Sequence, residues 1–331
     1  MKRILAILTA LIAFVFASCD QRPDSQSAQP QQGKAIIRIG HFPNITHAQA
    51  LVAAQLKRQG KGWFEERIPG VETQWFVYNA GPSAMEAIFA NSIDVTYVGP
   101  NPVLNAYSKS KGDEVRVLAG SALGGAALVV QGDGRIAKPA DFKGRKLATP
   151  QLGNTQDVAA RAWLTKQGFK ITQLGGDVLV VPTANPDQLS LFQQNQIDAV
   201  WTVEPWVTRL EREAEGKVYL EQPDALTTVL ASSVKFLREK PELAKKLLAA
   251  HLDLTKWINE HPAEARELVR AEIKAQTKRD FPAEVAEKAW SRLKFTGDVS
   301  RAQFDALVVE AQSVGFLRGT PPLDRLIEQP K

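Results

Sequence analysis

Cysteine is almost absent from this chain of 331 residues, since Cys19 is the only one. An internal disulfide needs two cysteines, so none can form, and a metal site built from several thiolates is excluded as well. Long apolar runs are also scarce, because after the N-terminus no segment reaches the roughly 18–20 residues that a membrane-spanning helix needs. Hydrophobic residues still make up 44% of the chain and charged residues 23%, which is enough for an ordinary apolar core without covalent crosslinks.

Strong charge and catalytic motifs are missing too. The chain has 41 lysines and arginines against 36 aspartates and glutamates, and no basic run is interleaved with aromatic residues, so no nucleic acid partner is expected. No HExxH, CxxC or GxSxG motif occurs. Two of the four histidines, His41 and His47, share a proline-containing turn without a third ligand nearby. We therefore expect no metal site, no cofactor and no enzymatic activity.

The N-terminus has the pattern of a secretory signal. Two basic residues precede an apolar stretch over residues 4–16, and small residues end this stretch just before Cys19. The small residues resemble a bacterial lipobox, which implies that Cys19 is lipidated, although Phe16 departs from the aliphatic residue usual at that place. We predict a signal peptide over 1–18 and a lipoprotein tether over 19–34. An ordinary signal peptide with an incidental cysteine is the alternative.

The tether is predicted to be disordered, because residues 20–33 include no large apolar side chain. Asp20, directly after the cysteine, resembles the signal that retains lipoproteins at the inner membrane of Gram-negative bacteria. The expected location is therefore the periplasm, with a lipid anchor in the outer face of the inner membrane.

Short β-rich runs alternate with amphipathic helical runs after the tether, a pattern typical of an α/β fold with largely parallel sheets. From about residue 234 to residue 318 the pattern is mainly helical, and Pro241, Pro262 and Pro282 suit the first turns of helices. The predicted strands are 36–39, 73–78, 94–98, 127–130, 146–148, 178–181 and 199–203, and the predicted helices include 48–58, 84–90, 158–167 and 188–194.

The helical tail cannot bury its apolar stripes alone, so we expect it to pack against one of two α/β lobes. Lobe 1 is predicted to comprise residues 35–129 plus 231–331, and lobe 2 residues 130–230. Two chain crossings, near 129–131 and near 228–232, then join the lobes. Two thin connections between two lobes form a hinge, with a cleft between the lobes.

The predicted strands end in turns of one kind, in which small or capping residues, often with proline, precede a helix. In an open α/β sheet such turns lie at the carboxyl ends of strands, where ligands bind, and each following helix begins with free N–H groups. The turns contain no Lys or Arg, so an anion there would be held by amides, hydroxyls and dipoles. That suits a singly charged oxyanion better than a phosphate. The turns are residues 40–48, 79–83, 99–102, 149–157 and 204–206.

These turns carry a resemblance to the solute-binding proteins of ABC importers for alkanesulfonates, taurine and nitrate. The matching segments are HFPNITHAQALV (41–52), NAGPSAMEAIFANSIDVTYVGPNP (79–102), ATPQLGNTQDVAARAWL (148–164) and WTVEPWV (201–207). The resemblance extends from about residue 35 to the tail. It implies a two-lobed, type II periplasmic-binding-protein-like fold, in which each lobe is a mixed sheet flanked by helices. It also implies closure over a small oxyanion, foremost an aliphatic sulfonate for sulfur uptake, and delivery of this ligand to an inner-membrane permease. We expect the protein to be a monomer.

In that family the cleft is lined by the turns just described. We expect Ser83 and Thr155 to donate hydroxyl and backbone N–H bonds to the oxyanion, while Asn101 and Gln156 donate side-chain amides. Ser121 is a weaker candidate, in a glycine-rich stretch that otherwise serves as a flexible approach to the first crossing. The predicted ligand-binding residues are Asn44, Thr46, His47, Gly81, Pro82, Ser83, Gly99, Pro100, Asn101, Ser121, Asn154, Thr155, Gln156, Trp201 and Trp206.

Some alternatives stay open on the sequence. Taurine, nitrate or a sulfate ester can replace the sulfonate, and a sensory or structural lipoprotein can use the same fold. His47 suits a capping or surface position equally well, and Trp201 suits the core. Glu204 would repel an anion, so it is expected at a helix N-terminus or against the opposite lobe. A quaternary amine is the remaining ligand class, which would need an aromatic cage of Phe42, Tyr97, Trp201 and Trp206 with Glu204 as counter-charge.

Overall fold

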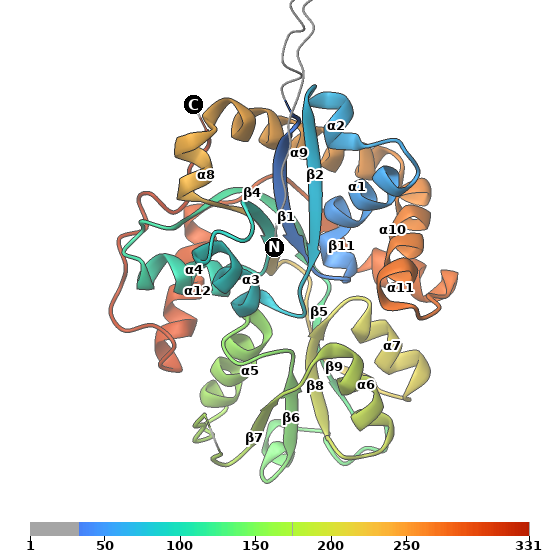
Figure 1. The fold of residues 1–331 in the computed structure, drawn as a ribbon. Coiled ribbons are helices and arrows are strands. Elements are labelled where there is room, and N and C mark those ends of the chain that lie inside the picture. Colours follow the sequence, from blue (N-terminus) through green and yellow to red (C-terminus); the bar gives the residue numbers. More distant parts are fainter. Residues whose placement is uncertain (1–32, 174, 331) are drawn as a thin grey trace, which may run out of the picture. The chain divides into compact units, whose positions relative to one another are not determined.

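The computed structural model describes residues 33–173 and 175–330. The predicted signal peptide, Cys19 and most of the predicted tether lie outside this range. Within it, two mixed β-sheets are each flanked by helices (Figure 1). We call them sheet A and sheet B. None of the helices in these two stretches has the length and apolar character that crossing a bilayer requires.

Sheet A has six strands in the order β11-β4-β10-β3-β1-β2. β1 pairs in parallel with β2 and β3, whereas β10 runs antiparallel to both β3 and β4. The strands are β1 (Ala35–His41), β2 (Val71–Val77), β3 (Val95–Val98), β4 (Val115–Gly124), β10 (Leu226–Ser233) and β11 (Leu293–Phe295).

Helices cover both faces of sheet A, and the two faces hold separate apolar clusters. Side chains of α1 (Ala48–Arg58), α2 (Trp63–Arg67), α9 (Pro241–Glu260), α10 (Pro262–Thr277) and α11 (Ala283–Ser291) form one cluster. Those of α3 (Gly81–Phe89), α4 (Pro100–Lys109) and α12 (Arg301–Ser313) form the other, and the short α8 (Val234–Glu239) links β10 to α9. The helical tail therefore packs against sheet A.

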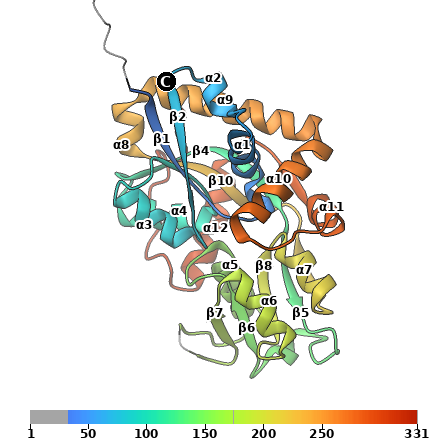
Figure 2. The same ribbon diagram turned by 45° about the vertical axis from the view of Figure 1, so that its right-hand side comes forward.

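Sheet B has five strands in the order β7-β6-β8-β5-β9. They are β5 (Ala126–Val130), β6 (Lys146–Thr149), β7 (Leu179–Pro182), β8 (Ala199–Val203) and β9 (Lys217–Gln222). Around them lie α5 (Thr155–Lys166), α6 (Asn185–Gln193), α7 (Trp206–Glu213) and the 3-10 turn η2 (Pro139–Phe142). The other 3-10 turn, η1 (Ile45–His47), links β1 to α1 beside sheet A. Side chains of α5 belong to one apolar cluster and those of α6 and α7 to another, so the helices seen around sheet B in Figure 2 cover both of its faces.

The chain passes between the sheets at points that differ from the predicted crossings. The predicted boundaries at 129/130 and 230/231 cut through β5, a strand of sheet B, and β10, a strand of sheet A. The actual passages are Gly125 and residues 223–225. Gly124 and Gly125 both have positive φ angles, of 75° and 70°, and glycine makes such a sharp turn possible at little cost. We call residues 33–124 plus 226–330 half A, and residues 126–173 plus 175–222 half B.

Strands β4, β9, β10 and β11 are absent from the sequence-based strand predictions. β4 and β10 are buried along almost their whole length and rich in Ala, Gly, Ser and Thr. Such strands lack both the alternating pattern and the bulky β-branched run by which strands are recognised. The glycine-rich stretch 119–125 is consequently mostly strand β4 and not a flexible approach.

Gly124 offers a test of the passage between the halves. A Cβ atom there would lie 2.5 Å from the Arg292 carbonyl oxygen and 2.8 Å from that of Pro223, whereas one at Gly134, where φ is 83°, meets nothing within 4 Å. Both Gly124→Ala and Gly134→Ala carry the strain of a positive φ. Only Gly124→Ala also overpacks its surroundings. We therefore expect it to lower the free energy of unfolding by about 1–3 kcal/mol more than Gly134→Ala does. Urea denaturation measures the free energy of unfolding of both variants. Equal losses in the two would contradict the claim that the chain is crowded at Gly124.

Candidate functional site

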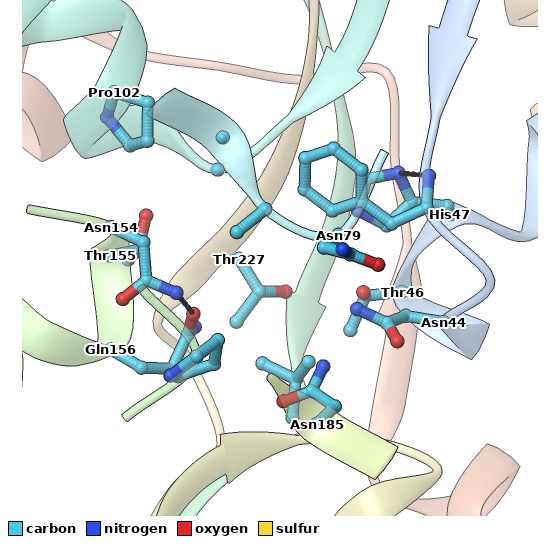
Figure 3. Close-up of a pocket in the computed structure, with 16 residues that line it drawn as sticks. Asn44, Thr46, His47, Asn79, Pro102, Asn154, Thr155, Gln156, Asn185 and Thr227 are labelled. Carbon is cyan, nitrogen blue, oxygen red and sulfur yellow. Dashed lines mark hydrogen bonds between the residues drawn. The ribbon is translucent and has the colours of Figure 1, made fainter. Parts of the chain in front are cut away.

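A small cavity lies between the two sheets, at the carboxyl ends of their parallel strands (Figure 3). Its volume is about 20 Å³, which is room for roughly one water molecule. Half A contributes Phe42, Asn44, Thr46, His47, Asn79, Ala80, Gly81, Gly99, Pro102 and Thr227, and half B contributes Pro150, Asn154, Thr155, Gln156, Asn185 and Val203. In Figure 3, Asn154 and Gln156 face Asn44 and Thr46 across this space.

Helix N-termini converge on the cavity from both halves. Gly81, Thr155 and Asn185 line it and are the first residues of α3, α5 and α6, and Gly99 is the residue that precedes α4. The first N–H groups of each helix have no partner within the helix and carry a partial positive charge. The positive dipole ends of four helices therefore meet at the cavity, although α4 begins with Pro100, which has no N–H group to donate.

The lining is free of formal charge: among the described residues it includes no Lys, Arg, Asp or Glu. Its single ionisable side chain is His47. The pKa of His47 is held well below its usual value, chiefly because burial disfavours the charged ring and also because His41 is close by. The Nδ1 atom of His47 accepts a hydrogen bond from the Phe42 N–H at 3.4 Å, and the two rings lie 4.4 Å apart. At neutral pH the site is thus polar and uncharged, and the His47 ring is held in place by its contacts with Phe42.

The two halves touch around the cavity. The Trp206 indole N–H donates to Oδ1 of Asn44 at 3.0 Å, and the Ile45 N–H donates to the Glu204 carbonyl at 3.2 Å. A Cβ atom at Gly99 would lie 2.4 Å from Oγ1 of Thr155 in the opposite half. Glycine at position 99 is therefore needed for the close approach of the halves, and the structure is a closed one.

The β6–α5 turn is fixed by a buried carboxylate that is not among the predicted binding residues. Asp157 accepts hydrogen bonds from Thr149 Oγ1 and the Gly153 N–H, both at 2.9 Å, and pairs with Arg161 at 3.0 Å. Asn154 caps α5 by accepting from the Asp157 N–H at 2.8 Å. The lining residues of this turn are accordingly held by contacts behind the cavity wall.

The predicted binding residues fall into three groups. Asn44, Thr46, His47, Gly81, Gly99, Asn154, Thr155 and Gln156 line the cavity. Pro82, Ser83, Pro100, Asn101 and Trp206 belong to the same turns without lining it. Ser121 and Trp201 lie elsewhere: Ser121 Oγ donates to Gln49 Oε1 at 2.7 Å within half A, and Trp201 packs in the core of half B.

Asn101 is unusual among the residues of these turns. Its side chain is buried, yet neither its Nδ2 nor its Oδ1 atom has a hydrogen-bond partner among the described residues. Its backbone N–H lies 3.4 Å from Thr155 Oγ1, across the boundary between the halves. Buried amide groups are normally paired, so this side chain has unused hydrogen-bonding capacity next to the cavity.

Several lining residues were missed by the sequence-based site prediction. Asn185 follows β7 in the sequence ANPDQ, which has the same proline-containing form as the other turns, so this signal was available. Asn79 and Pro102 lie inside turns that were recognised. Thr227 lies at the start of β10, a strand with no clear sequence pattern, and nothing marked it.

The aromatic cage needed for a quaternary amine is not assembled. Of its four aromatic residues only Phe42 lines the cavity. Tyr97 is buried in half A, where its hydroxyl lies 3.0 Å from Nδ1 of His251, and Trp201 is in the core of half B. Glu204 accepts from the Thr208 N–H at the start of α7 and pairs with Arg292 of half A.

No group of three or more His, Cys, Asp or Glu side chains suited to a metal ion occurs in the described part of the chain.

Comparison with known proteins identifies the family. Residues 30–273 match the model of the NMT1-like family. The chain belongs to the NMT1-like family. Over 338 aligned residues the NMT1-like protein is 26% identical to a Bacillus subtilis (strain 168) protein named for the binding of aliphatic sulfonates, covering 99% of this chain and 93% of that one. It is also 26% identical to a protein of Brucella abortus (strain 2308) named as a binding protein, and it spans only 64% of that relative's length.

Solved structures share the fold of the NMT1-like protein. The alkanesulfonate-binding protein SsuA from Xanthomonas axonopodis pv. citri, bound to MOPS, superimposes with a TM-score of 0.72 at 16% identity, over 89% of this chain and 98% of that chain. The periplasmic aliphatic sulphonate binding protein SsuA from Escherichia coli gives 0.67 at 18% identity, over 89% and 92%. The predicted two-lobed periplasmic-binding-protein fold is confirmed. All these relatives are named as binding proteins, in agreement with the expectation that the NMT1-like protein is not an enzyme.

The buried, uncharged His47 leads to a testable pH dependence. A histidine in the unfolded chain takes up a proton below a pH of about 6.5, while His47 in the folded chain does not. The free energy of unfolding therefore falls as the pH drops below that value, by up to about 1.4 kcal/mol per pH unit for this residue.

We expect His47→Gln to remove this share of the slope between pH 6.5 and 5 in urea unfolding. His261→Gln, at the exposed connection between α9 and α10, is the control and should keep the slope of the natural protein. Identical slopes for the natural protein and His47→Gln would contradict a neutral His47.

Proposed function

We propose that this NMT1-like protein is the extracytoplasmic solute-binding component of an ABC importer, and that it captures a small monovalent oxyanion, foremost an aliphatic sulfonate. The observation that carries the proposal is the uncharged cavity, into which helix N-termini from both halves point. The names of the relatives from Bacillus subtilis, Xanthomonas and Escherichia coli support the same ligand class.

The absence of charged lining residues favours a single negative charge on the ligand. Each helix N-terminus is equivalent to roughly half a positive charge, and the Asn, Gln and Thr side chains of the lining add neutral donors. The cost of removing an ion from water grows steeply with its charge, and doubly charged groups usually recruit Arg or Lys in compensation. The cavity offers enough stabilisation for a sulfonate but lacks the cations that suit a sulfate or phosphate dianion.

Individual residues supply the contacts in this proposal. The Thr155 hydroxyl and the N–H groups of the first residues of α3 and α5 hold the oxyanion, and Asn154 and Gln156 add their amides. Asn101, with its unpaired amide beside the cavity, turns toward the ligand when the halves adjust around it. Phe42 and Val203 are the large apolar lining side chains, and a short aliphatic tail lies against them.

Capture proceeds by hinge closure at residues 125 and 223–225. Contacts such as the one from Trp206 to Asn44 join the halves beside the cavity, and its volume of about 20 Å³ holds roughly one water molecule, so a larger ligand is accommodated when the halves part. Because the ligand contacts both halves, it binds the closed form and shifts the population toward it. The closed protein then delivers its ligand to a permease in the inner membrane.

The remaining features belong to the same proposal. The protein acts as a monomer in the periplasm, held to the outer face of the inner membrane by a lipid on Cys19. Nitrate is a second candidate ligand, since it carries one negative charge and has no tail to accommodate between the halves. Sulfate monoesters are further monovalent candidates, and taurine, a zwitterion, offers the same singly charged sulfonate group.

A thermal-shift screen followed by calorimetric titration tests the function. Ethanesulfonate, taurine, nitrate, methyl sulfate and inorganic sulfate are the probes. At 100 times its dissociation constant, a ligand adds about 2.7 kcal/mol to the free energy of unfolding, and we expect a monovalent probe to raise the Tm by several degrees while sulfate does not. No shift with any monovalent probe, or tighter binding of sulfate, would contradict the proposal.

A pair of variants on α5 locates the binding site. Thr155→Val removes a hydroxyl from the cavity, and loss of a hydrogen bond to a charged group costs about 1.5–3 kcal/mol, or roughly 10- to 100-fold in affinity. Thr165→Val, which changes an exposed residue of the same helix, is the matched control and should bind as the natural protein does.

A further inference from the structure

A cluster of ion pairs joins the two halves beside the crossings and outside the lining of the cavity. Arg292, between α11 and β11, belongs to half A, and its three carboxylate partners all belong to half B. Its Nη1 atom lies 2.9 Å from Glu204 Oε1 and 2.8 Å from Glu211 Oε2, and its Nε atom lies 3.0 Å from Glu221 Oε1. In Figures 1 and 2, α11 lies directly above α7, the helix that carries Glu211.

Burial separates this cluster from an ordinary surface ion pair. The Glu204 side chain is 0% exposed and that of Arg292 is 17% exposed. Burial raises the pKa of Glu204, and the Thr208 N–H and Arg292 counteract the rise. Breaking a buried pair leaves an uncompensated charge and is strongly destabilising, in contrast to exposed pairs. The ion pair between Arg292 and Glu204 therefore stabilises the position of the β8–α7 turn.

That turn forms the link from Arg292 to the cavity wall. The Glu204 carbonyl accepts from the Ile45 N–H at 3.2 Å, and Trp206, two residues later, donates to Asn44 Oδ1 at 3.0 Å. Asn44 and its neighbour Thr46 line the cavity. A displacement of the turn would consequently break both of these hydrogen bonds to the cavity wall.

We propose that Arg292 is a positioning residue for ligand capture. By binding carboxylates of half B from half A, it fixes the β8–α7 turn against residues 44–46 and holds the cavity in its closed arrangement. The ligand-binding consequence depends on the proposed function, whereas the effect on the two halves can be measured without any ligand.

The chain provides a matched control at the same crossing. Lys294 of half A pairs with Asp224, in the connection from β9 to β10, at 2.9 Å, but the two side chains are 67% and 78% exposed. Replacing Lys294 by methionine also deletes one positive charge, two residues from Arg292. Lys294→Met should therefore leave both the halves and ligand binding unchanged.

The experiment combines small-angle X-ray scattering of the ligand-free protein with calorimetric titration of ethanesulfonate. Arg292→Met should increase the radius of gyration, because the halves part more often. If the closed form becomes ten times rarer, the apparent dissociation constant rises tenfold, and we expect at least that change. A radius of gyration and an affinity equal to those of Lys294→Met would overturn the proposal.

A double variant guards against simple misfolding of Arg292→Met. Glu204→Gln combined with Arg292→Met removes the buried unpaired charge, so its Tm should recover toward the natural value, while the radius of gyration stays increased and binding stays weak. Recovery of all three would mean a structural role only and would overturn the proposal. If no probe binds even the natural protein, the proposed function fails, and the scattering comparison still decides the role of Arg292.

Discussion

The carboxyl ends of parallel strands from two sheets face one another across a space that none of the described residues lines with a charged side chain, and everything about the site depends on this arrangement. Helix N-termini provide electropositive character there through backbone groups that neither titrate nor move as side chains do. His47, kept neutral by burial, does not alter the balance. Recognition therefore depends on the geometry of the turns and on the ligand's own charge.

This site exists only where the halves meet. Asn44 and Thr46 belong to one half and Asn154 and Thr155 to the other, and neither set encloses a ligand alone. Close approach depends on small details, such as the missing side chain at Gly99. Binding and closure are accordingly one event, and residues at the rear of the boundary, with Arg292 foremost, influence the cavity without touching it.

The sequence was informative wherever local chemistry repeats. Turns with capping residues and proline identified most of the lining, and the helical tail was recognised by its periodicity and prolines. It was uninformative where long-range packing decides the structure. β4 and β10 consist largely of small residues, and they form strands because other elements cover both of their faces. Since this packing is not visible in the sequence, Ser121 of β4 was assigned to the cleft, whereas it contacts Gln49 within half A. Trp201 and Thr227 show the same limit, because a side chain's direction depends on sheet partners that the sequence does not name.

The most direct test is a crystal structure of the protein with ethanesulfonate. The account predicts a sulfonate group in the cavity between the halves, with its oxygens at hydrogen-bond distance from backbone N–H groups at the starts of α3, α4 or α5 and from Thr155, and with no Lys or Arg side chain in contact. A sulfonate bound outside this cavity, or one paired with a lysine or an arginine, would contradict it.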